Sequence, residues 1–485
     1  MHYRTITRIT GLLVALFSIT MLPPVAVSMI YDDGGGTAFV QAFLLSLVVG
    51  GILWYPNRQY KQDLRTREGF LIVVLFWTVL GAMGTLPFLL VDTPQLGLAD
   101  SVFESFSALT TTGATVIVGL DELPKAILFY RHQLQWLGGM GIIVLAVAIL
   151  PVLGIGGMQL YRAEIPGPVK DSKMTPRIAE TAKTLWYIYL LLTIACAGAF
   201  YLAGMTSFDA ICHSFSTIAI GGFSTHDASI GYYQSPTINL ICVFFLLVAA
   251  VNFSLHFAAF SRTGINVKTY FKDAEFRALV MIQLALTAIC FATLYHSGIY
   301  DSPEETFDYA LFQAVSVSTT AGFGTESFHE WPLFLPILLI FSSFIGGCGG
   351  STAGGIKVIR MVLLVLQGFR ELKRLIHPRA MFSIRIGTKA LPDRVIDAVW
   401  GFFSAYALVF VVCMLILMAT GMDAITSFSA TAACLNNLGP GLGDVAANYA
   451  AISDAEKYVL VIAMLFGRLE VFTLLVLFIP SFWKN

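Results

Sequence analysis

The chain has 485 residues, of which 57% are hydrophobic and only 12% charged, and its mean hydropathy is +0.77. Soluble domains carry about 25% charged residues, so this composition excludes an ordinary soluble enzyme or binding domain and predicts a polytopic, all-α membrane protein. The formal net charge of -1 provides no overall field that would attract a nucleic acid.

Ten segments are apolar over the about 20 residues that a helix needs to cross a bilayer. The first begins close to Met1, continues to Tyr31 and has no clear small-residue cleavage site, so we interpret it as a span and not as a signal peptide. In chain order, the predicted spans are 8–31, 37–55, 69–91, 126–150, 184–204, 236–260, 277–297, 332–376 (long and interrupted), 395–420 and 457–480.

Lys and Arg are distributed unequally among the loops, and this inequality predicts the orientation. One side holds 25 of the 29 basic residues together with both termini, so we expect it to be cytoplasmic. The opposite loops are acidic, which would raise the local cation concentration, but ordinary solvated loops explain the acids equally well. The basic loops are 56–68, 161–184, 261–277 and 357–394.

Four short apolar stretches lie between spans on the acidic side, beginning near residues 100, 208, 306 and 423. With about 11–14 residues each, they are too short to cross a bilayer and are typical of re-entrant helices. Such helices are tolerated at membrane depth only where protein or a water-filled cavity surrounds them. Each runs into a turn centred on a glycine, and these turns are Thr110-Thr111-Thr112-Gly113, Ala219-Ile220-Gly221-Gly222, Thr319-Thr320-Ala321-Gly322 and Asn436-Asn437-Leu438-Gly439.

The repeated turns predict a cation pore. Small and hydroxyl residues around a glycine let carbonyl oxygens face a common axis, and four such turns can surround one dehydrated cation. The C-terminal ends of the short helices, which carry partial negative charge, would point toward the membrane centre and favour a cation there. One glycine would mean little, but four at matched positions are hard to explain otherwise. Six residues before the glycines stand Ser107, Ser216, Ser316 and Ala433, and an aspartate is expected to open each short helix, at Asp100, Asp209, Asp308 and Asp423.

A glycine-rich break interrupts the eighth predicted span. Each glycine costs a helix about 1 kcal/mol against alanine, so six glycines in ten residues predict a non-helical loop that lines the pore and acts as its gate. A tight helix–helix contact through small residues is the main alternative. A phosphate-binding loop is excluded, because no Gly-Lys-Ser/Thr sequence follows. The segment is Gly346-Gly347-Cys348-Gly349-Gly350-Ser351-Thr352-Ala353-Gly354-Gly355.

Arg468 lies in the middle of the last predicted span. A charge there costs about 2.5–3.5 kcal/mol on insertion scales and normally faces a pore or a partner. We expect Arg468 to project into the cation path below the turns and to form part of the gate. A structural ion pair with Glu470 is the alternative, although residues two apart face different sides of a helix. Arg131 and His132, near the start of another span, are expected to reach the membrane surface.

The basic loop 357–394 favours contact with lipid headgroups or with an acidic partner, and the sequence leaves both open. The seven cysteines lie in or beside apolar segments without the spacing of a disulfide framework, so we interpret them as small buried hydrophobes.

On the four glycine turns, the glycine-rich break and the two additional N-terminal spans, the chain resembles the TrkH/KtrB/HKT superfamily of potassium and sodium transporters, and within it the bacterial TrkH family. The resemblance covers nearly the whole chain. It implies four span–pore-helix–span repeats in a pseudo-fourfold arrangement around one pore. It also implies a homodimer in the inner membrane, a nucleotide-binding (NAD, ATP or ADP) cytosolic ring of the TrkA type as regulator, and contacts with membrane lipids.

The same resemblance implies residue roles. The K⁺ filter would consist of backbone carbonyl groups at and just before the four glycines, and the glycine-rich segment with Arg468 would be the gate. Gly113 favours K⁺ over Na⁺, because a serine at this position is often linked with Na⁺ transport. No tyrosine follows the glycines, and Asn436 and Asn437 replace hydroxyl residues, so we expect moderate selectivity and passage of Rb⁺.

The expected units are 1–68 (two N-terminal helices), 69–160, 161–261, 262–394 (with the gating loop 346–355) and 395–485. We expect transport of K⁺ without catalysis or an organic cofactor. Alternatives are an H⁺-coupled K⁺ symporter, for which Glu470 or His256 would be the proton carrier, and a Na⁺/K⁺ transporter. An intramembrane serine protease using Ser351 and His256 would leave the four turns unexplained.

Overall fold

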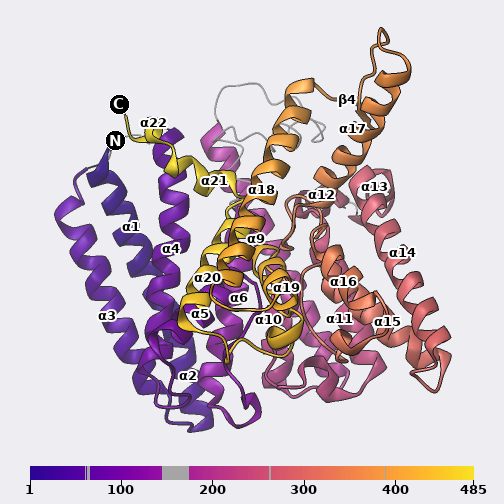
Figure 1. Cartoon of the computed structure of the whole chain (residues 1–485). Coiled ribbons are helices and arrows are strands. Elements are labelled where there is room, and N and C mark those ends of the chain that lie inside the picture. Colours follow the sequence, from indigo (N-terminus) through magenta and orange to yellow (C-terminus); the bar gives the residue numbers. More distant parts are fainter. Residues whose placement is uncertain (61, 63–65, 145–173, 262–263, 388, 485) are drawn as a thin grey trace.

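The computed structural model describes residues 1–60, 62, 66–144, 174–261, 264–387 and 389–484 (Figure 1). These ranges are all-α apart from two antiparallel hairpins of two-residue strands, in which Phe260 lies opposite Ile265 and Arg385 opposite Ala390. The two chain ends lie at the same end of the helix bundle (Figure 1).

The first half of the chain forms an N-terminal helix pair and two groups in which a short helix lies between longer ones. The elements are α1 (Tyr3–Ser18), η1 (Ile19–Met21), α2 (Leu22–Tyr31), α3 (Gly36–Trp54), η2 (Tyr55–Asn57), α4 (Thr66–Leu90), α5 (Leu98–Leu109), η3 (Leu120–Glu122), α6 (Lys125–Val144), α9 (Met174–Leu202), α10 (Ser207–Ala219), η5 (Ser229–Tyr233), α11 (Pro236–Ala250) and α12 (Phe253–Ala259).

The second half repeats this arrangement twice. Its elements are β1 (Phe260–Ser261), β2 (Gly264–Ile265), α13 (Lys268–Lys272), α14 (Ala274–Ser297), α15 (Pro303–Ser318), η6 (Phe328–Glu330), α16 (Leu335–Ser343), α17 (Val358–Ile376), β3 (Arg385–Ile386), β4 (Lys389–Ala390), α18 (Asp393–Ala419), α19 (Ala424–Leu435), η7 (Gly443–Val445), α20 (Asp454–Arg468), α21 (Phe472–Leu475), η8 (Val476–Phe478) and α22 (Pro480–Trp483).

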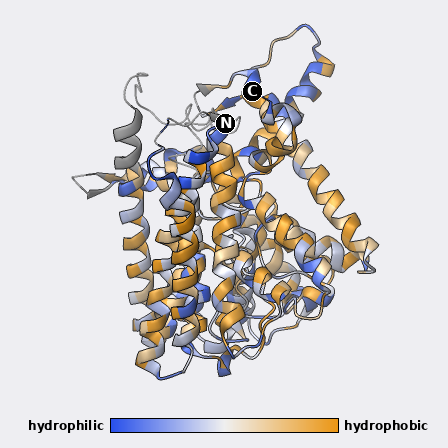
Figure 2. Ribbon diagram, turned by 90° about the vertical axis from the view of Figure 1, so that its left-hand side faces the viewer, coloured by the Kyte–Doolittle hydropathy of each residue, from blue (hydrophilic) through white to orange (hydrophobic). Residues whose placement is uncertain are grey.

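Hydrophobic residues cover most of the length of the long helices (Figure 2). Within the described residues, six helices are long and apolar enough to cross a membrane, or up to eight if two bent pairs each count as one span. The bends are 93° between α11 and α12 and 107° between α20 and the α21–η8 segment. These eight correspond to eight of the ten predicted spans.

The two other predicted spans can be compared with the structure only in part. The end of the predicted span 126–150 lies outside the described residues, as does most of the basic loop 161–184. The predicted span 332–376 is divided into α16 and α17, and the glycine-rich segment forms the non-helical break between them, as expected.

The four short helices α5, α10, α15 and α19 pack in a ring. Each lies against the two longer helices that flank it in the chain. Each also packs against the last long helix of the preceding group, so that α10 contacts α6, α15 contacts α11 and α19 contacts α16. The first short helix, α5, contacts α20 from the last group. The contacts therefore close into a cycle of four.

Hydroxyl residues cap two of these short helices in place of the expected aspartates. Asp423 caps α19, and its carboxylate accepts hydrogen bonds from two backbone N–H groups of the first turn. In α10 and α15 the caps are Thr206 and Ser302. The expectation that an aspartate opens every short helix is wrong for α15, because the upstream cap places Asp308 inside the helix, where it accepts a hydrogen bond from Asn239 (2.6 Å).

The N-terminal helices α1 and α3 approach each other through glycines. A Cβ atom on Gly11 would lie 2.8 Å from the carbonyl oxygen of Gly50, and one on Gly50 would lie 2.9 Å from the carbonyl oxygen of Gly11. Small residues allow such a close approach of membrane helices. This pair joins the ring of helices through contacts of α1 with α4 and of α2 with α6.

Candidate functional site

The four glycine turns share one backbone arrangement. In each turn the residue two positions before the glycine is left-handed, at Thr111 (φ 51°), Ile220 (φ 51°), Thr320 (φ 69°) and Asn437 (φ 56°). The next residue donates its N–H to a carbonyl oxygen five positions upstream; these pairs are Thr112 and Ser107 (2.8 Å), Gly221 and Ser216 (2.8 Å), Ala321 and Ser316 (2.8 Å), and Leu438 and Ala433 (2.7 Å). The sequence register therefore corresponds to a repeated structure.

The glycines of the four turns contact one another around a ring. All four are left-handed, at Gly113 (φ 78°), Gly222 (φ 76°), Gly322 (φ 77°) and Gly439 (φ 97°). A Cβ atom on each would overlap the carbonyl oxygen of the residue before the next glycine, that is of Gly221, Ala321, Leu438 and Thr112 in turn. Only glycine combines this backbone conformation with so close an approach. Four carbonyl groups from four distant parts of the chain thus meet in one place.

A cavity of about 100 Å³ lies on one side of this ring and is lined by all four glycines. Arg131, His226 and Asp227 also line it. Asp227 binds the neighbouring loop, because its carboxylate accepts hydrogen bonds from the N–H groups of Gly119 (3.1 Å) and Leu120 (3.0 Å).

Arg131 is fully buried, so the expectation that it reaches the membrane surface is wrong. Its Nε donates to the carboxylate of Glu104 on α5 (2.7 Å), and both side chains are 0% exposed. The guanidinium group also lies over the ring of Phe223, 4.1 Å from its centroid. Glu104 in turn accepts hydrogen bonds from the hydroxyl of Thr115 and from the N–H of Val116 (3.0 Å). The ion pair thus holds the segment that follows Gly113.

His132 is also buried, and its expected surface position is wrong as well. Its Nδ1 lies 2.6 Å from the carbonyl oxygen of Leu128 on the same helix. Its ring lies 6.0 Å from that of His213 on α10. The two residues occupy the contact between α6 and α10, which explains why neither side chain points outward.

His226 lies at the rim of the cavity between two carboxylates. It contacts Asp121 directly, and its Nε2 lies 3.7 Å from Asp209. Its ring stacks on Tyr232 at 3.5 Å between centroids. Burial lowers the pKa of His226, but its interactions with Asp209 and Asp121 outweigh burial, so the pKa is raised above its ordinary value.

The glycine-rich segment lies directly beside the third and fourth turns and beside the end of α10, which leads into the second turn. The N–H of Gly354 donates to the hydroxyl of Thr320 (2.7 Å), and the N–H of Gly355 donates to the carbonyl of Asn436 (3.1 Å). The hydroxyl of Thr352 donates to the carbonyl of Ile218, at the end of α10 (2.9 Å). Elsewhere, the loop is bonded to the break between α11 and α12.

Arg468 is 4% exposed and connects the loop to the first turn. Its guanidinium group donates to the hydroxyl of Thr111 and lies 3.4 Å from the carbonyl oxygen of Thr352. The loop and Arg468 together therefore contact three of the four turns and the end of α10, immediately before the second turn.

Glu470 does not pair with Arg468. Its carboxylate binds Arg360, at 2.6 Å between Oε2 and Nη2. Both line a cavity of about 20 Å³ together with Lys357 and Arg468. Three cationic side chains and one carboxylate therefore surround this cavity, beyond the ring of glycines.

Glu104 and Gln135 are functional candidates that the sequence reasoning missed. The carboxamide of Gln135 donates to the carbonyl of Gly221 (2.6 Å) and accepts from the N–H of Phe223 (3.2 Å), which fixes the second turn. Glu104 carries the charge nearest to the first turn in α5, and Gln135 lies four positions after Arg131 on α6, so both share a helix with a predicted site or anomaly, and this proximity is the signal that could have identified them.

Comparison with known proteins places these features in a family. The model of the TrkH family, described as cation transport proteins, matches residues 35–485. The Trk system potassium uptake proteins TrkH of Vibrio parahaemolyticus and Escherichia coli K12 are 68% and 62% identical to this chain over 485 residues, with 100% of both chains covered in each case. The crystal structure of the potassium transporter TrkH from Vibrio parahaemolyticus has a TM-score of 0.93 at 65% identity and covers 100% of both chains.

Proposed function

This chain belongs to the TrkH family of cation transport proteins, and we propose that it mediates K⁺ uptake through a gated, channel-like pore that also conducts Rb⁺. Its apolar helices and its family make it a multi-pass membrane protein. We assign it to the bacterial inner membrane with both termini in the cytoplasm, because the basic loops and the chain ends share one side.

The ring of four glycine turns is the observation that carries this proposal. A closed cycle of carbonyl groups from α5, α10, α15 and α19 can replace the hydration shell of one cation. The cavity of about 100 Å³ next to the ring would be the outer mouth. We infer that the filter consists of the carbonyl groups at and just before Gly113, Gly222, Gly322 and Gly439.

We assign the gate to the glycine-rich loop and Arg468. Bonds from both to the first, third and fourth turns and to the end of α10 would obstruct the path directly inside the filter. The cationic cluster around the small inner cavity would raise the barrier for K⁺ further. Opening would require these contacts to break together, which suits control by a bound regulator.

The family resemblance supplies the further parts of the proposal. We infer a homodimer, a cytosolic TrkA-type ring that binds NAD, ATP or ADP, and contacts with membrane lipids. The repeat units would be 69–160, 161–261, 262–394 and 395–485, preceded by the helices of 1–68.

Proton-coupled symport is the alternative, and Na⁺/K⁺ transport is another. The proposed proton carriers both have internal partners: Glu470 binds Arg360, and His256 lies 2.8 Å from the hydroxyl of Tyr270. A coupled transporter would respond to an imposed pH difference, whereas a channel-like pore conducts K⁺ down its gradient without one.

The test is ⁸⁶Rb⁺ flux into liposomes for the wild type, Arg468→Ala and a deletion within 346–355. We expect both variants to leak faster than the wild type, and we expect K⁺ to compete more strongly than Na⁺. Arg58→Ala is the matched control, because it removes an arginine at an exposed position remote from the turns. Absence of K⁺-competed flux even in the deletion variant would overturn the pore proposal.

A further inference from the structure

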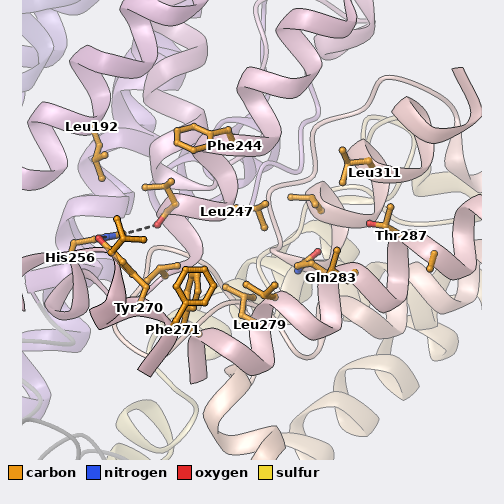
Figure 3. Close-up of a pocket in the computed structure, with 18 of the residues that line it drawn as sticks. Leu192, Phe244, Leu247, His256, Tyr270, Phe271, Leu279, Gln283, Thr287 and Leu311 are labelled. Atoms are coloured by element: carbon orange, nitrogen blue, oxygen red, sulfur yellow. Dashed lines mark hydrogen bonds between the residues drawn. The ribbon is translucent and has the colours of Figure 1, made fainter. Parts of the chain in front are cut away.

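A large apolar cavity lies between the second and third groups of helices, away from the pore. Its volume is about 920 Å³, at the upper end of the range of about 300–1,000 Å³ typical of ligand sites. It lies between α9 and α11 on one side and α14 and α15 on the other, with α12 and α13 at one end (Figure 3). In the described part of the chain, α14 packs on α15, α13 and α17 without a broad contact to α9 or α11.

The cavity wall is almost entirely apolar. The stripe that α14 contributes runs from Phe276 to Phe291, which corresponds to about 22 Å at 1.5 Å per residue. One leaflet of a bilayer core is about 15 Å thick, so the stripe is long enough for an extended acyl chain. Of the polar groups in the wall, His256 binds Tyr270 and the carboxamide of Gln283 binds Ser318 (2.7 Å), whereas the hydroxyl of Thr287 is the one group there without a hydrogen-bond partner in the described residues. The cavity therefore suits a hydrocarbon chain.

Exposed cationic side chains lie on the two helices, α13 and α14, that border one end of this cavity. Helix α13 places Tyr270 and Phe271 in the wall while Lys268 and Lys272 are exposed. Arg277, one turn into α14, is exposed as well. None of the three cations has an ion pair within the described residues, and they belong to a loop on the basic side of the protein. Their position matches that of an anionic headgroup whose acyl chain fills the cavity.

We propose that this cavity binds an anionic phospholipid, with one acyl chain between α11 and α14 and the phosphate on Lys268, Lys272 and Arg277. The site also has a route to the pore. Glu275, at the start of α14, accepts hydrogen bonds from the N–H groups of Gly349 (2.7 Å) and Ile359 (3.1 Å), at the glycine-rich loop and the start of α17.

The same helix is attached to the third pore helix. Gln283 binds Ser318, the last residue of α15 and the residue before Thr319 of the third turn. A bound chain that supports α14 therefore stabilises the closed arrangement of the loop. This coupling, unlike the lipid site itself, rests on the proposed gate.

The lipid site is tested by mass spectrometry of phospholipid that remains bound to the full-length protein after purification from phosphatidylcholine vesicles with about a quarter phosphatidylglycerol. We expect phosphatidylglycerol to be retained selectively. Retention should fall about tenfold in Lys268→Gln/Lys272→Gln and also in Ala288→Trp, which fills the cavity.

Two control variants separate the site from general effects. Ala407→Trp makes the same substitution at an exposed position on α18, and Arg58→Gln/Lys484→Gln removes two exposed cations from elements that do not line the cavity; neither should change retention. Unchanged retention in the lysine variant, whose exposed substitutions leave the packing intact, would overturn the site. A second result would also overturn the site. If Ala288→Trp converts a dimer into a monomer but still retains phosphatidylglycerol, then a second copy of the chain, and not a lipid, occupies the cavity.

The coupling is measured separately as ⁸⁶Rb⁺ flux. Wild-type protein should leak about threefold faster in pure phosphatidylcholine than with phosphatidylglycerol present, and the lysine variant should leak equally in both. Equal wild-type flux in both membranes would refute the coupling. If neither the wild type nor the lysine variant shows flux in either membrane, the proposed pore is contradicted. The lipid site would then be judged from the retention experiment by itself.

Discussion

Replacing Gly222 with alanine tests whether the ring of glycine turns is a filter. Gly222 is left-handed (φ 76°), and a Cβ there would overlap the carbonyl oxygen of Ala321. Gly298, at the exposed C-terminal end of α14, is also left-handed (φ 63°), but a Cβ there would meet no atom within 4 Å. Gly298→Ala therefore shares the backbone cost of Gly222→Ala without the steric conflict.

The magnitudes follow from these two environments. The left-handed conformation costs an alanine about 1–2 kcal/mol, and both variants carry this cost. In Gly222→Ala the carbonyl of Ala321 must also move by roughly 1 Å to restore a permitted contact, and overpacking of this kind costs about 1–3 kcal/mol. The sum of about 2–5 kcal/mol does not exceed a typical free energy of unfolding of about 5–15 kcal/mol, so both proteins should fold.

The assays are chemical unfolding in detergent and ⁸⁶Rb⁺ flux with K⁺ and Na⁺ as competitors. Both variants should lose stability, with Gly222→Ala losing about 1–3 kcal/mol more. Only Gly222→Ala should lose K⁺ selectivity, by about tenfold if the displaced carbonyl weakens K⁺ binding by about 1.4 kcal/mol. Unchanged flux and selectivity in a folded Gly222→Ala protein would refute the assignment of this ring as the filter.

Three other predictions concern the surroundings of the filter. Glu104→Gln leaves Arg131 buried without its ion pair and should lower the free energy of unfolding by about 3–5 kcal/mol, measured by chemical unfolding; a change within 0.5 kcal/mol would contradict the pairing. Because the pKa of His226 is raised, its charged form stabilises the rim fully below about pH 6.5 and less as the pH rises through the folded pKa. Backbone amide hydrogen exchange in residues 223–235 should therefore accelerate with pH in the wild type by more than the intrinsic exchange rate does. In His226→Gln, this additional acceleration should be absent. Thr352→Val removes the hydrogen bond to Ile218 and should increase ⁸⁶Rb⁺ leak, and an unchanged leak would argue against a role of this contact in closing the gate.

Sequence periodicity and turn chemistry predicted the elements well but their side-chain partners poorly. Apolar length identified the spans, and the cost of six glycines located the break between α16 and α17. Burial of Arg131 depends on Glu104, which lies 27 positions upstream on another helix. Glu470 is paired with Arg360, 110 positions away, and not with the nearby Arg468. Such pairs are products of tertiary packing, so local spacing in the sequence does not contain them.

Closure of the ring joins the two ends of the repeated region. Asn437 donates to the hydroxyl of Thr112 across 325 positions of sequence (2.9 Å), and Arg468 reaches Thr111 across 357. Chains emerge from the ribosome N-terminus first, so the turn at Gly113 enters the membrane long before its neighbour at Gly439 exists. Until then, polar backbone of the first turn needs water or a temporary protein partner in the bilayer. The polar centre of this protein therefore receives its final partners only when the last helices are in place.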